Sequence, residues 1–174
     1  MGDIETKITN VSNAMFAGGI LGSGSVSNSY NMGNIINYAN NYTTEESSNT
    51  IFVAGIVGSS IGRVFNNYNV GNINNIVIPP ESAQLYIETT PIGNYCTEAS
   101  NNYYLNNIEL IGENNVNVIE ATPLSEEYMK SKEFYNELSK FAGDGNSWKY
   151  INKQYPILDI ATVSNAQKIT EITV

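Results

Sequence analysis

An internal repeat constrains the fold of this chain more than any other feature of its sequence. The segment AGGILGSGSVSNSYNMGNI, residues 17–35, and the segment VAGIVGSSIGRVFNNYNVGNI, residues 53–73, carry Gly, Tyr, Asn and Gly in the same order. A degraded third copy, TTPIGNYCTEASNNYYLNN, follows at residues 89–107. A repeat of roughly 35 residues made of short apolar runs and glycine-rich turns cannot close a core alone, so it buries its apolar face by stacking on the next copy.

The aligned copies place like residues in columns. The columns are Gly22, Gly58 and Gly93; Leu21, Val57 and Ile92; Val26, Val64 and Ala99; Asn28, Asn66 and Asn101; and Tyr30, Tyr68 and Tyr103. The second copy carries a two-residue insertion at Ser60-Ile61 or its neighbours. Alternate residues from Val26 to Met32 have the period of a half-buried strand. We therefore predict an all-β fold, a short right-handed parallel β-solenoid of about three degenerate coils, with Asn amides bonded along the stack.

Glycines and polar segments predict the corners of each coil. Glycine at position 22, 58 or 93 would serve a corner that needs a positive φ or a close backbone approach, and Gly33 and Gly71 would serve the next one. The segments 40–49 and 74–90 are interpreted as loops or short extra strands that leave the solenoid. Insertions in a solenoid gather on one face, which is often the binding face.

The C-terminal third of the chain changes character. We assign residues 1–120 to the repeat solenoid, 121–160 to a small helical cap with a closing strand, and 161–174 to a linker or trailing strand. A helix start is predicted at Thr122-Pro123, or at Ser125 with Glu126 and Glu127 behind it. Phe134, Leu138 and Phe141 follow at helical spacing, which predicts a short amphipathic helix that covers the open end of the stack.

The repeats resemble the GLUG-motif repeats of bacterial surface proteins. The four residues that begin at Gly19 and at Gly55 read GILG and GIVG, and the phrase Asn-x-Tyr-Asn-x-Gly-Asn follows both. The third copy reads Thr90-Pro91-Ile92-Gly93 and lacks the first glycine of the motif. The resemblance implies an exported or wall-associated protein of Gram-positive or Bacteroidetes bacteria, with adhesin-like proteins and non-catalytic parts of immunoglobulin-A-specific metallopeptidases among its relatives. It implies no catalytic residue. The N-terminus shows no basic-then-apolar leader, so either the protein is intracellular or an export signal lies outside this stretch, and we expect the latter, with flanking domains in the same polypeptide.

Charge and residue usage exclude several function classes. The chain has 8 Lys+Arg against 17 Asp+Glu, a net charge of −9, which repels phosphate backbones, so we expect no nucleic-acid partner. No apolar run approaches the length of a membrane span, so we expect no membrane insertion. The chain contains no His, which excludes Ser-His and Cys-His nucleophiles and the HExxH zinc motif. We therefore predict a protein that is not an enzyme and uses no cofactor or metal.

Aromatic residues supply the candidates for ligand binding. Stacked rings can bind sugar faces, but the parity of the tyrosine column predicts that it packs in the core. Tyr42 and Tyr86 are the preferred surface binding residues, with Tyr95 and Tyr104 as further candidates. The remaining candidate groups are interpreted as ordinary surface chemistry: Arg63 as a turn charge, Glu126 and Glu127 as first-turn acids of a helix, and Asp144-Gly145-Asn146 as a plain turn.

These observations favour a non-enzymatic structural or adhesive module of a bacterial cell-surface or secreted protein. A carbohydrate-binding accessory module of a larger surface enzyme is the first alternative, and a polysaccharide lyase-like β-helix enzyme is the second. The expected partners are a host or cell-wall glycan or protein and the flanking domains of the same polypeptide.

Overall fold

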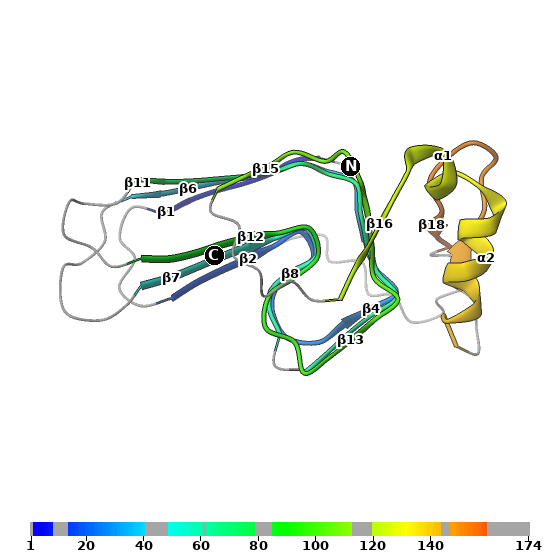
Figure 1. The fold of residues 1–174 in the computed structure, drawn as a ribbon, viewed down its shortest axis with the longest axis horizontal. Helices are drawn as coiled ribbons and strands as arrows, with labels where there is room; N and C mark the ends of the chain where they lie inside the picture. Colours follow the sequence, from blue (N-terminus) through cyan, green and yellow to red (C-terminus); the bar gives the residue numbers. More distant parts are fainter. Residues whose placement is uncertain are drawn as a thin grey trace. The chain divides into compact units, whose positions relative to one another are not determined.

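The computed structural model describes residues 2–8, 14–40, 49–60, 62–78, 85–112, 120–143 and 147–159. The chain divides into two compact units, Met1–Glu126 and Glu127–Val174, and each is described by itself. The first unit is built almost entirely of strands, and the second contains two short helices and a small hairpin (Figure 1).

The first unit is a stack of parallel coils, as the repeat predicted. The chain enters through β1 (Ile4–Ile8), and the first coil comprises β2 (Ala14–Gly18), β3 (Leu21–Ser23), β4 (Val26–Ser27), β5 (Tyr30–Asn31) and β6 (Ile35–Asn40). The second coil comprises β7 (Asn49–Ala54), β8 (Val57–Ser59), β9 (Arg63–Phe65), β10 (Tyr68–Asn69) and β11 (Ile73–Ile78). The third comprises β12 (Leu85–Thr90), β13 (Glu98–Ser100), β14 (Tyr103–Leu105) and β15 (Leu110–Ile111). This arrangement is a parallel β-solenoid.

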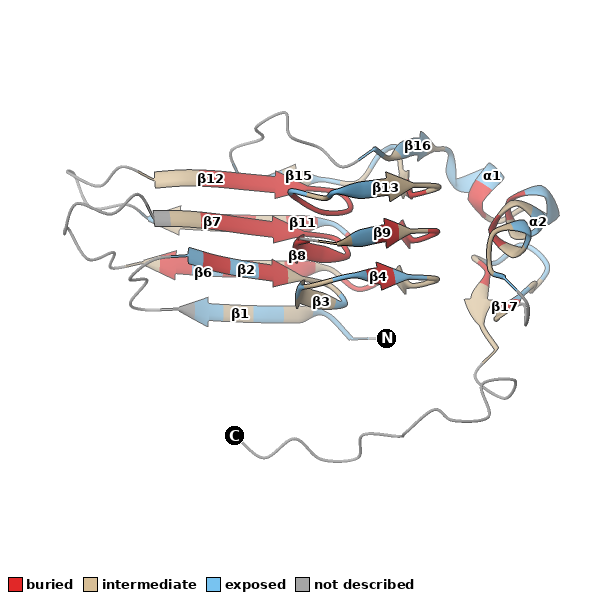
Figure 2. Ribbon diagram, turned by 90° about the horizontal axis from the view of Figure 1, so that it is seen from below, coloured by how far each residue is buried: buried red, intermediate tan, exposed pale blue. Residues whose placement is uncertain are grey.

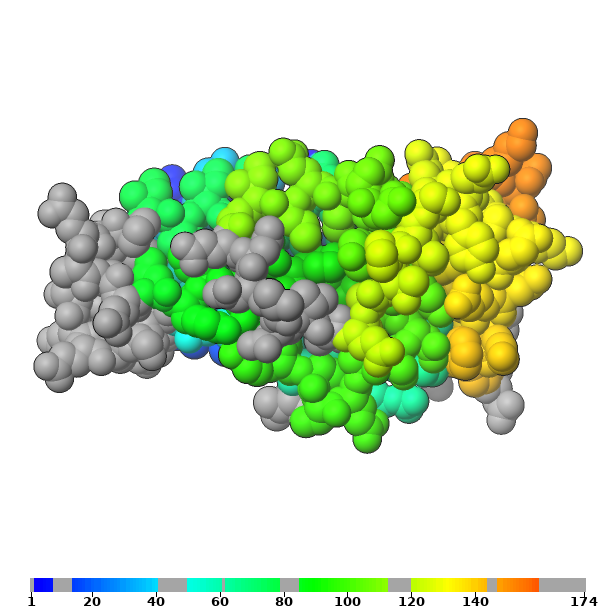
Figure 3. Space-filling model, in the orientation of Figure 1, coloured from blue at the N-terminus to red at the C-terminus, as the bar shows by residue number. Residues whose placement is uncertain are grey.

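Equivalent strands of successive coils pair side by side. We call the resulting sheets after their first strand: the β1 sheet in the order β1-β6-β11-β15, the β2 sheet in the order β2-β7-β12, the β4 sheet in the order β4-β9-β13, and the β5 sheet in the order β5-β10-β14-β16. Strand β16 is Thr122–Leu124. Figure 1 looks along the stack, so strands of one sheet overlap. In Figure 3, which has the same orientation, the third coil is seen in green on the face toward the viewer.

The tyrosine column is in register through all coils. Tyr68 pairs with Tyr30 on one side and with Tyr103 on the other. The rings of Tyr30 and Tyr68 are stacked, with centroids 5.4 Å apart and an interplanar angle of 11°. Val64 likewise lies between Val26 and Ala99. The predicted stacking of like residues is confirmed at these columns.

The predicted glycine column is wrong in the third coil. Gly93 lies opposite Val57 and not opposite Gly58. The backbone N–H groups of Ile56 and Val57 both donate to the carbonyl of Ile92 at 3.0 Å, as the equivalent groups one coil earlier donate to the carbonyl of Ile56. The third coil is therefore displaced by one residue from the alignment on glycine. The register of the third coil is set by these backbone hydrogen bonds, and the shared glycine does not determine it.

Two kinds of corner replace the continuous strand that the alternation predicted. Asn28, Asn66 and Asn101 have φ angles of 50°, 57° and 54°, in the left-handed region that Asn tolerates better than most residues. Each is a corner between two short strands, so the alternation from Val26 onward is interrupted there. Gly71 serves the second kind of corner through close approach, because a Cβ there would overlap the carbonyl of Gly33.

The apolar core consists of two clusters. The first lies between the β1 and β2 sheets and contains Met15, Ala17, Ile35, Ala39, Ile51, Val53, Ile73 and Ile87. The second lies among the shorter strands and contains Val26, Ile56, Val57, Val64 and Ile92. In Figure 2 the buried parts of the long strands form successive layers. Residues 74–78 and 85–90 belong to these long strands, so the prediction that they leave the solenoid is wrong.

Asparagine side chains bond from coil to coil inside the stack. Nδ2 of Asn37 donates to Oδ1 of Asn75 at 2.8 Å, and Nδ2 of Asn75 donates to Oγ1 of Thr89 at 3.1 Å. Nδ2 of Asn67 donates to Oδ1 of Asn102 at 3.0 Å. Buried amides without partners would destabilise the fold, whereas stacked amides satisfy one another.

The second unit is a short helical segment followed by a hairpin. It comprises α1 (Glu126–Met129), α2 (Lys132–Lys140), β17 (Trp148–Lys149) and β18 (Ile157–Leu158). Ser131 caps α2 by accepting a hydrogen bond from the N–H of Phe134 at 3.2 Å. Phe134 and Leu138 are buried, and Trp148 pairs with Leu158. Among the described residues, no helix is long and apolar enough to cross a bilayer.

The predicted helix start at Thr122-Pro123 is wrong. These residues belong to β16, which pairs with β14 and places Pro123 opposite Tyr104. Proline is tolerated there because β16 is the edge strand of the β5 sheet. The segment 161–174 lies outside the described residues, and the covering of the stack by the helical unit stays a prediction.

Candidate functional site

An aromatic cluster lies on the outer face of the β2 sheet. Successive residues of a strand point to opposite faces, so the core positions of Met15 and Ala17 place Phe16 outside. Phe16, Phe52 and Glu88 are directly opposite one another in β2, β7 and β12. The column is thus aromatic in two coils and carboxylic in the third.

Four rings form this cluster, which we define as Phe16, Phe52, Tyr86 and Tyr95, and the Phe52 ring contacts each of the other three. The ring centroid of Phe52 lies 5.5 Å from that of Phe16, 5.8 Å from that of Tyr86 and 5.1 Å from that of Tyr95. Phe52 is 4% exposed, whereas Phe16 is 40% and Tyr95 48% exposed. The outer rings therefore present apolar surface to solvent, and Phe52 fixes their positions from below.

A carboxylate completes the cluster. Oε1 of Glu88 accepts a hydrogen bond of 2.6 Å from the hydroxyl of Tyr86. Glu88 is fully buried, and its Oε2 has no hydrogen-bond partner among the described residues. The hydrogen bond to Glu88, followed by one to Tyr95, raises the pKa of Tyr86 above its ordinary value. Tyr86 is therefore held as a neutral hydroxyl whose proton is committed to the carboxylate.

This arrangement suits recognition more than acid-base chemistry. Exposed ring faces can cover the apolar CH surface of a sugar, whereas the buried Glu88 is occupied by Tyr86 and is out of reach of a ligand. No group of three His, Cys, Asp or Glu side chains in the described part of the chain could hold a metal ion.

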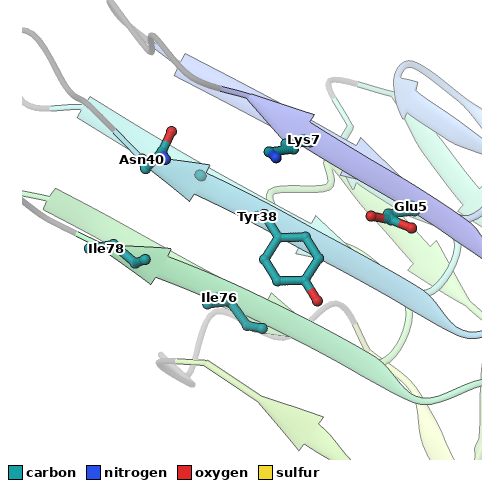
Figure 4. Close-up of a pocket in the computed structure, with 7 residues that line it drawn as sticks. Glu5, Lys7, Tyr38, Asn40, Ile76 and Ile78 are labelled. Atoms are coloured by element: carbon teal, nitrogen blue, oxygen red, sulfur yellow. The ribbon is translucent and has the colours of Figure 1, made fainter.

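A second surface feature is a hollow on the outer face of the β1 sheet. It has a volume of about 280 Å³ and is lined by Glu5, Lys7, Tyr38, Ala39, Asn40, Ile76 and Ile78. Figure 4 shows the side chains of β1, β6 and β11 around it. Tyr38 is 39% exposed and Ile78 is 63% exposed, so the hollow joins an apolar floor to a charged edge strand.

The candidate tyrosines have different outcomes. Tyr86 belongs to the aromatic cluster, and Tyr95, which lies against Phe52, is exposed as predicted. Tyr104 is wrongly predicted as a surface residue, because it packs against the second apolar cluster. Tyr42 lies outside the described residues.

The tyrosine column is buried at Tyr68 and Tyr103, as predicted, but for a different reason. The amide of Asn69 lies against Gly55 inside the coil, and Tyr104 occupies the equivalent position one coil later. Tyr68 therefore lies on the opposite face of the β5 sheet, outside both apolar clusters. The parity with Val26 does not apply, since a left-handed corner separates the two strands.

The other candidate groups form ordinary contacts. The guanidinium of exposed Arg63 lies 4.3 Å from the ring centroid of Phe65. Sγ of Cys96 lies 3.0 Å from the carbonyl oxygen of Gly62 and 2.8 Å from that of Glu98. Glu126 and Glu127 begin α1 and are exposed. The segment 144–146 lies outside the described residues.

Phe16, Phe52 and Glu88 are candidate site residues that were not predicted from the sequence. Their signal was present, because Phe16 and Phe52 occupy equivalent positions of successive coils, one repeat apart. The alignment began after Phe16, at residue 17, and treated residues 74–90 as an excursion. It therefore never compared the strands that carry these side chains.

Comparisons with known proteins identify no relative. No protein-family model, no curated protein and no solved structure matches this chain.

Proposed function

We propose that this chain is a non-enzymatic structural and adhesive module of a bacterial cell-surface or secreted protein. The stacked coils serve as a stiff scaffold, and their outer faces present binding groups. The resemblance to GLUG-motif repeats supports the location, which antibody labelling of intact cells of the source organism would test.

The observation that carries the scaffold role is the bonding between coils. Backbone ladders pair each of the long strands of the second coil with a neighbour on either side. The buried Asn37, Asn75 and Thr89 side chains add bonds along the same direction. Every coil is thus held to the next by both main-chain and side-chain hydrogen bonds, which resist separation along the stack.

Single-molecule force spectroscopy of the full chain tests this role. If the coils act as one scaffold, the stack unfolds in one cooperative step, and Asn75→Leu lowers the unfolding force. Asn107→Leu is the matched control, because this asparagine is exposed in a turn. Gradual extension without a force peak would contradict the scaffold role.

Carbohydrate binding is the second candidate function, and the aromatic cluster favours it. Phe16 and Tyr95 are exposed, and the ring of buried Phe52 contacts both of them. Such a site would take a neutral saccharide, since the net charge of −9 disfavours acidic glycans.

A glycan array followed by titration calorimetry tests this candidate. Tyr95→Ala should weaken binding of any selected glycan by about tenfold, because one ring face is removed. Tyr38→Ala removes a similarly exposed ring from the β1 sheet and should leave binding unchanged. Equal losses in both variants, or an array without selective binding, would contradict carbohydrate binding at this cluster.

A further inference from the structure

Strand β1 is an edge strand with one free side. Among the described strands, it is the terminal strand of its sheet and pairs in parallel with β6 only. Figure 2 shows it as the outermost strand of the first unit. Within the described part of the chain, nothing pairs with its other side. Unpaired N–H and C=O groups on an edge strand are a template for pairing with another chain.

The backbone of Glu5 and Lys7 faces this free side. The N–H of Ile4 donates to the carbonyl of Asn34 at 2.9 Å, which fixes the direction of its backbone groups toward β6. Backbone groups alternate along a strand, so Thr6 also faces β6, and Glu5 and Lys7 face away from it. These two residues can therefore exchange N–H and C=O bonds with a further strand.

The sequence of β1, IETKI, is complementary to itself in the antiparallel direction. When Thr6 lies opposite Thr6 of a second copy, Glu5 lies opposite Lys7 of that copy and Lys7 opposite its Glu5. Opposite charges directly across an antiparallel pair are stabilising, and these are the same residues whose backbone groups are free. A parallel pairing in register would instead place like charges opposite each other.

The two charged side chains are available for such a contact. Glu5 and Lys7 are both exposed, and neither forms an ion pair within the described residues. Figure 4 shows them on β1, beside the hollow that Tyr38 and Ile76 line. Pairing of two β1 strands would continue the β1 sheet from one copy to the other and place the two hollows on one continuous face.

We infer that the free edge of β1 binds a second copy of this chain in a two-fold symmetric antiparallel pair centred on Thr6. The contact is isologous, as most dimer interfaces are. It is also small, because it joins one strand of five residues to its copy. Small interfaces give weak complexes, so the dimer is reversible and depends on protein concentration.

Sedimentation velocity of the full chain over a range of concentrations tests this inference. The wild-type protein shifts from monomer to dimer as concentration rises. The single variants Glu5→Lys and Lys7→Glu each place two like-charge pairs across the two-fold axis, and each weakens dimerisation roughly tenfold. The double variant Glu5→Lys with Lys7→Glu restores both pairs and returns the dissociation constant to the wild-type value.

The charge exchange separates a specific pair from a general charge effect. Glu5→Lys makes the acidic chain less negative and Lys7→Glu makes it more negative, so a general effect would move the two dissociation constants in opposite directions. Circular dichroism should show the same fold in all variants, since both side chains are exposed. A monomer at every concentration, or a double variant that stays monomeric, would overturn the inference.

Amide hydrogen exchange gives an independent test of the register. The N–H groups of Glu5 and Lys7 become protected as the dimer forms, whereas the N–H of Thr6 is already bonded to β6 and changes little. Protection that appears at other strands and not at Glu5 and Lys7 would assign the dimer to a different surface and overturn the proposal.

Discussion

The side-chain amide of Asn31 bonds directly to that of Asn69, one coil away, with 2.9 Å between Nδ2 and Oδ1. Each of these buried amides also closes its own corner, as Asn69 accepts a bond from the N–H of Gly71 and donates one to the carbonyl of the same residue. The same pair of bonds links Asn31 to Gly33. One residue type thus satisfies the corner of its own coil and joins that coil to the next.

Asn69→Leu should destabilise the stack strongly. The substitution keeps a similar volume but leaves buried groups of Asn31 and Gly71 without partners, at a cost of about 2–4 kcal/mol in the free energy of unfolding. Urea denaturation measures this change. Asn107→Leu, in an exposed turn, is the control and should change the free energy of unfolding little. An equal effect of both variants would contradict the role of the buried amides.

Gly71→Ala should destabilise the fold through a backbone clash. A Cβ at Gly71 would overlap the carbonyl of Gly33 in the preceding coil, so the two coils must move apart. We expect a loss of several kcal/mol, on the order of that for an overpacked core, by thermal denaturation. Gly2→Ala is the control, because its Cβ would meet no atom within 4 Å. Unchanged stability of Gly71→Ala would show that the coils are not in close contact at this corner.

Asn101→Ala should destabilise the protein, and Asn101→Gly should not. Asn101 has a φ of 54°, where an ordinary L-residue costs about 1–2 kcal/mol and glycine costs nothing sterically. The difference in the free energy of unfolding between the two variants measures the left-handed corner. Alanine and glycine variants of the same stability would contradict that backbone conformation.

The sequence predicted the columns better than the path of the chain between them. The Tyr30 and Tyr68 column followed from residue identity, because identical large side chains stack in a parallel solenoid. The third coil was misaligned at Gly93, since the number of residues between strands changes from coil to coil and only backbone bonds reveal where. The alternation predicted a strand through Asn28, because a polar residue at a left-handed corner can occupy a position that also fits the two-residue period of a strand.

The candidate site was predicted in part. Tyr86 was found as an aromatic residue outside the repeat phrase, but its partners Phe52 and Glu88 were not. Phe52 and Glu88 directly precede the repeat phrases that begin at residues 53 and 89, so the alignment of those phrases did not include them. Ring contacts between different coils depend on the register of the strands. The alignment of the sequence repeats placed the third coil one residue out of register.

Tyr86 should ionise above the ordinary tyrosine pKa of 10.0, because its hydroxyl donates to Glu88. The bond stabilises the folded protein below pH 10, and this contribution is lost as pH rises through the raised pKa. Glu88→Gln should bring the pKa of Tyr86 down toward 10.0, as followed by tyrosinate absorbance. The Tyr86→Phe variant identifies the titration step. If the titration step of Tyr86 stays at its raised pKa in the Glu88→Gln variant, the assigned hydrogen bond is contradicted.

Direct contact between side chains of successive coils is most simply measured by nuclear Overhauser effects between the rings of Tyr30 and Tyr68. Their centroids are 5.4 Å apart, so strong cross-peaks between their ring protons are predicted, and Tyr68→Phe assigns them. Absence of these cross-peaks in the folded, assigned protein would mean that the two tyrosines are not neighbours and would contradict the stacked solenoid.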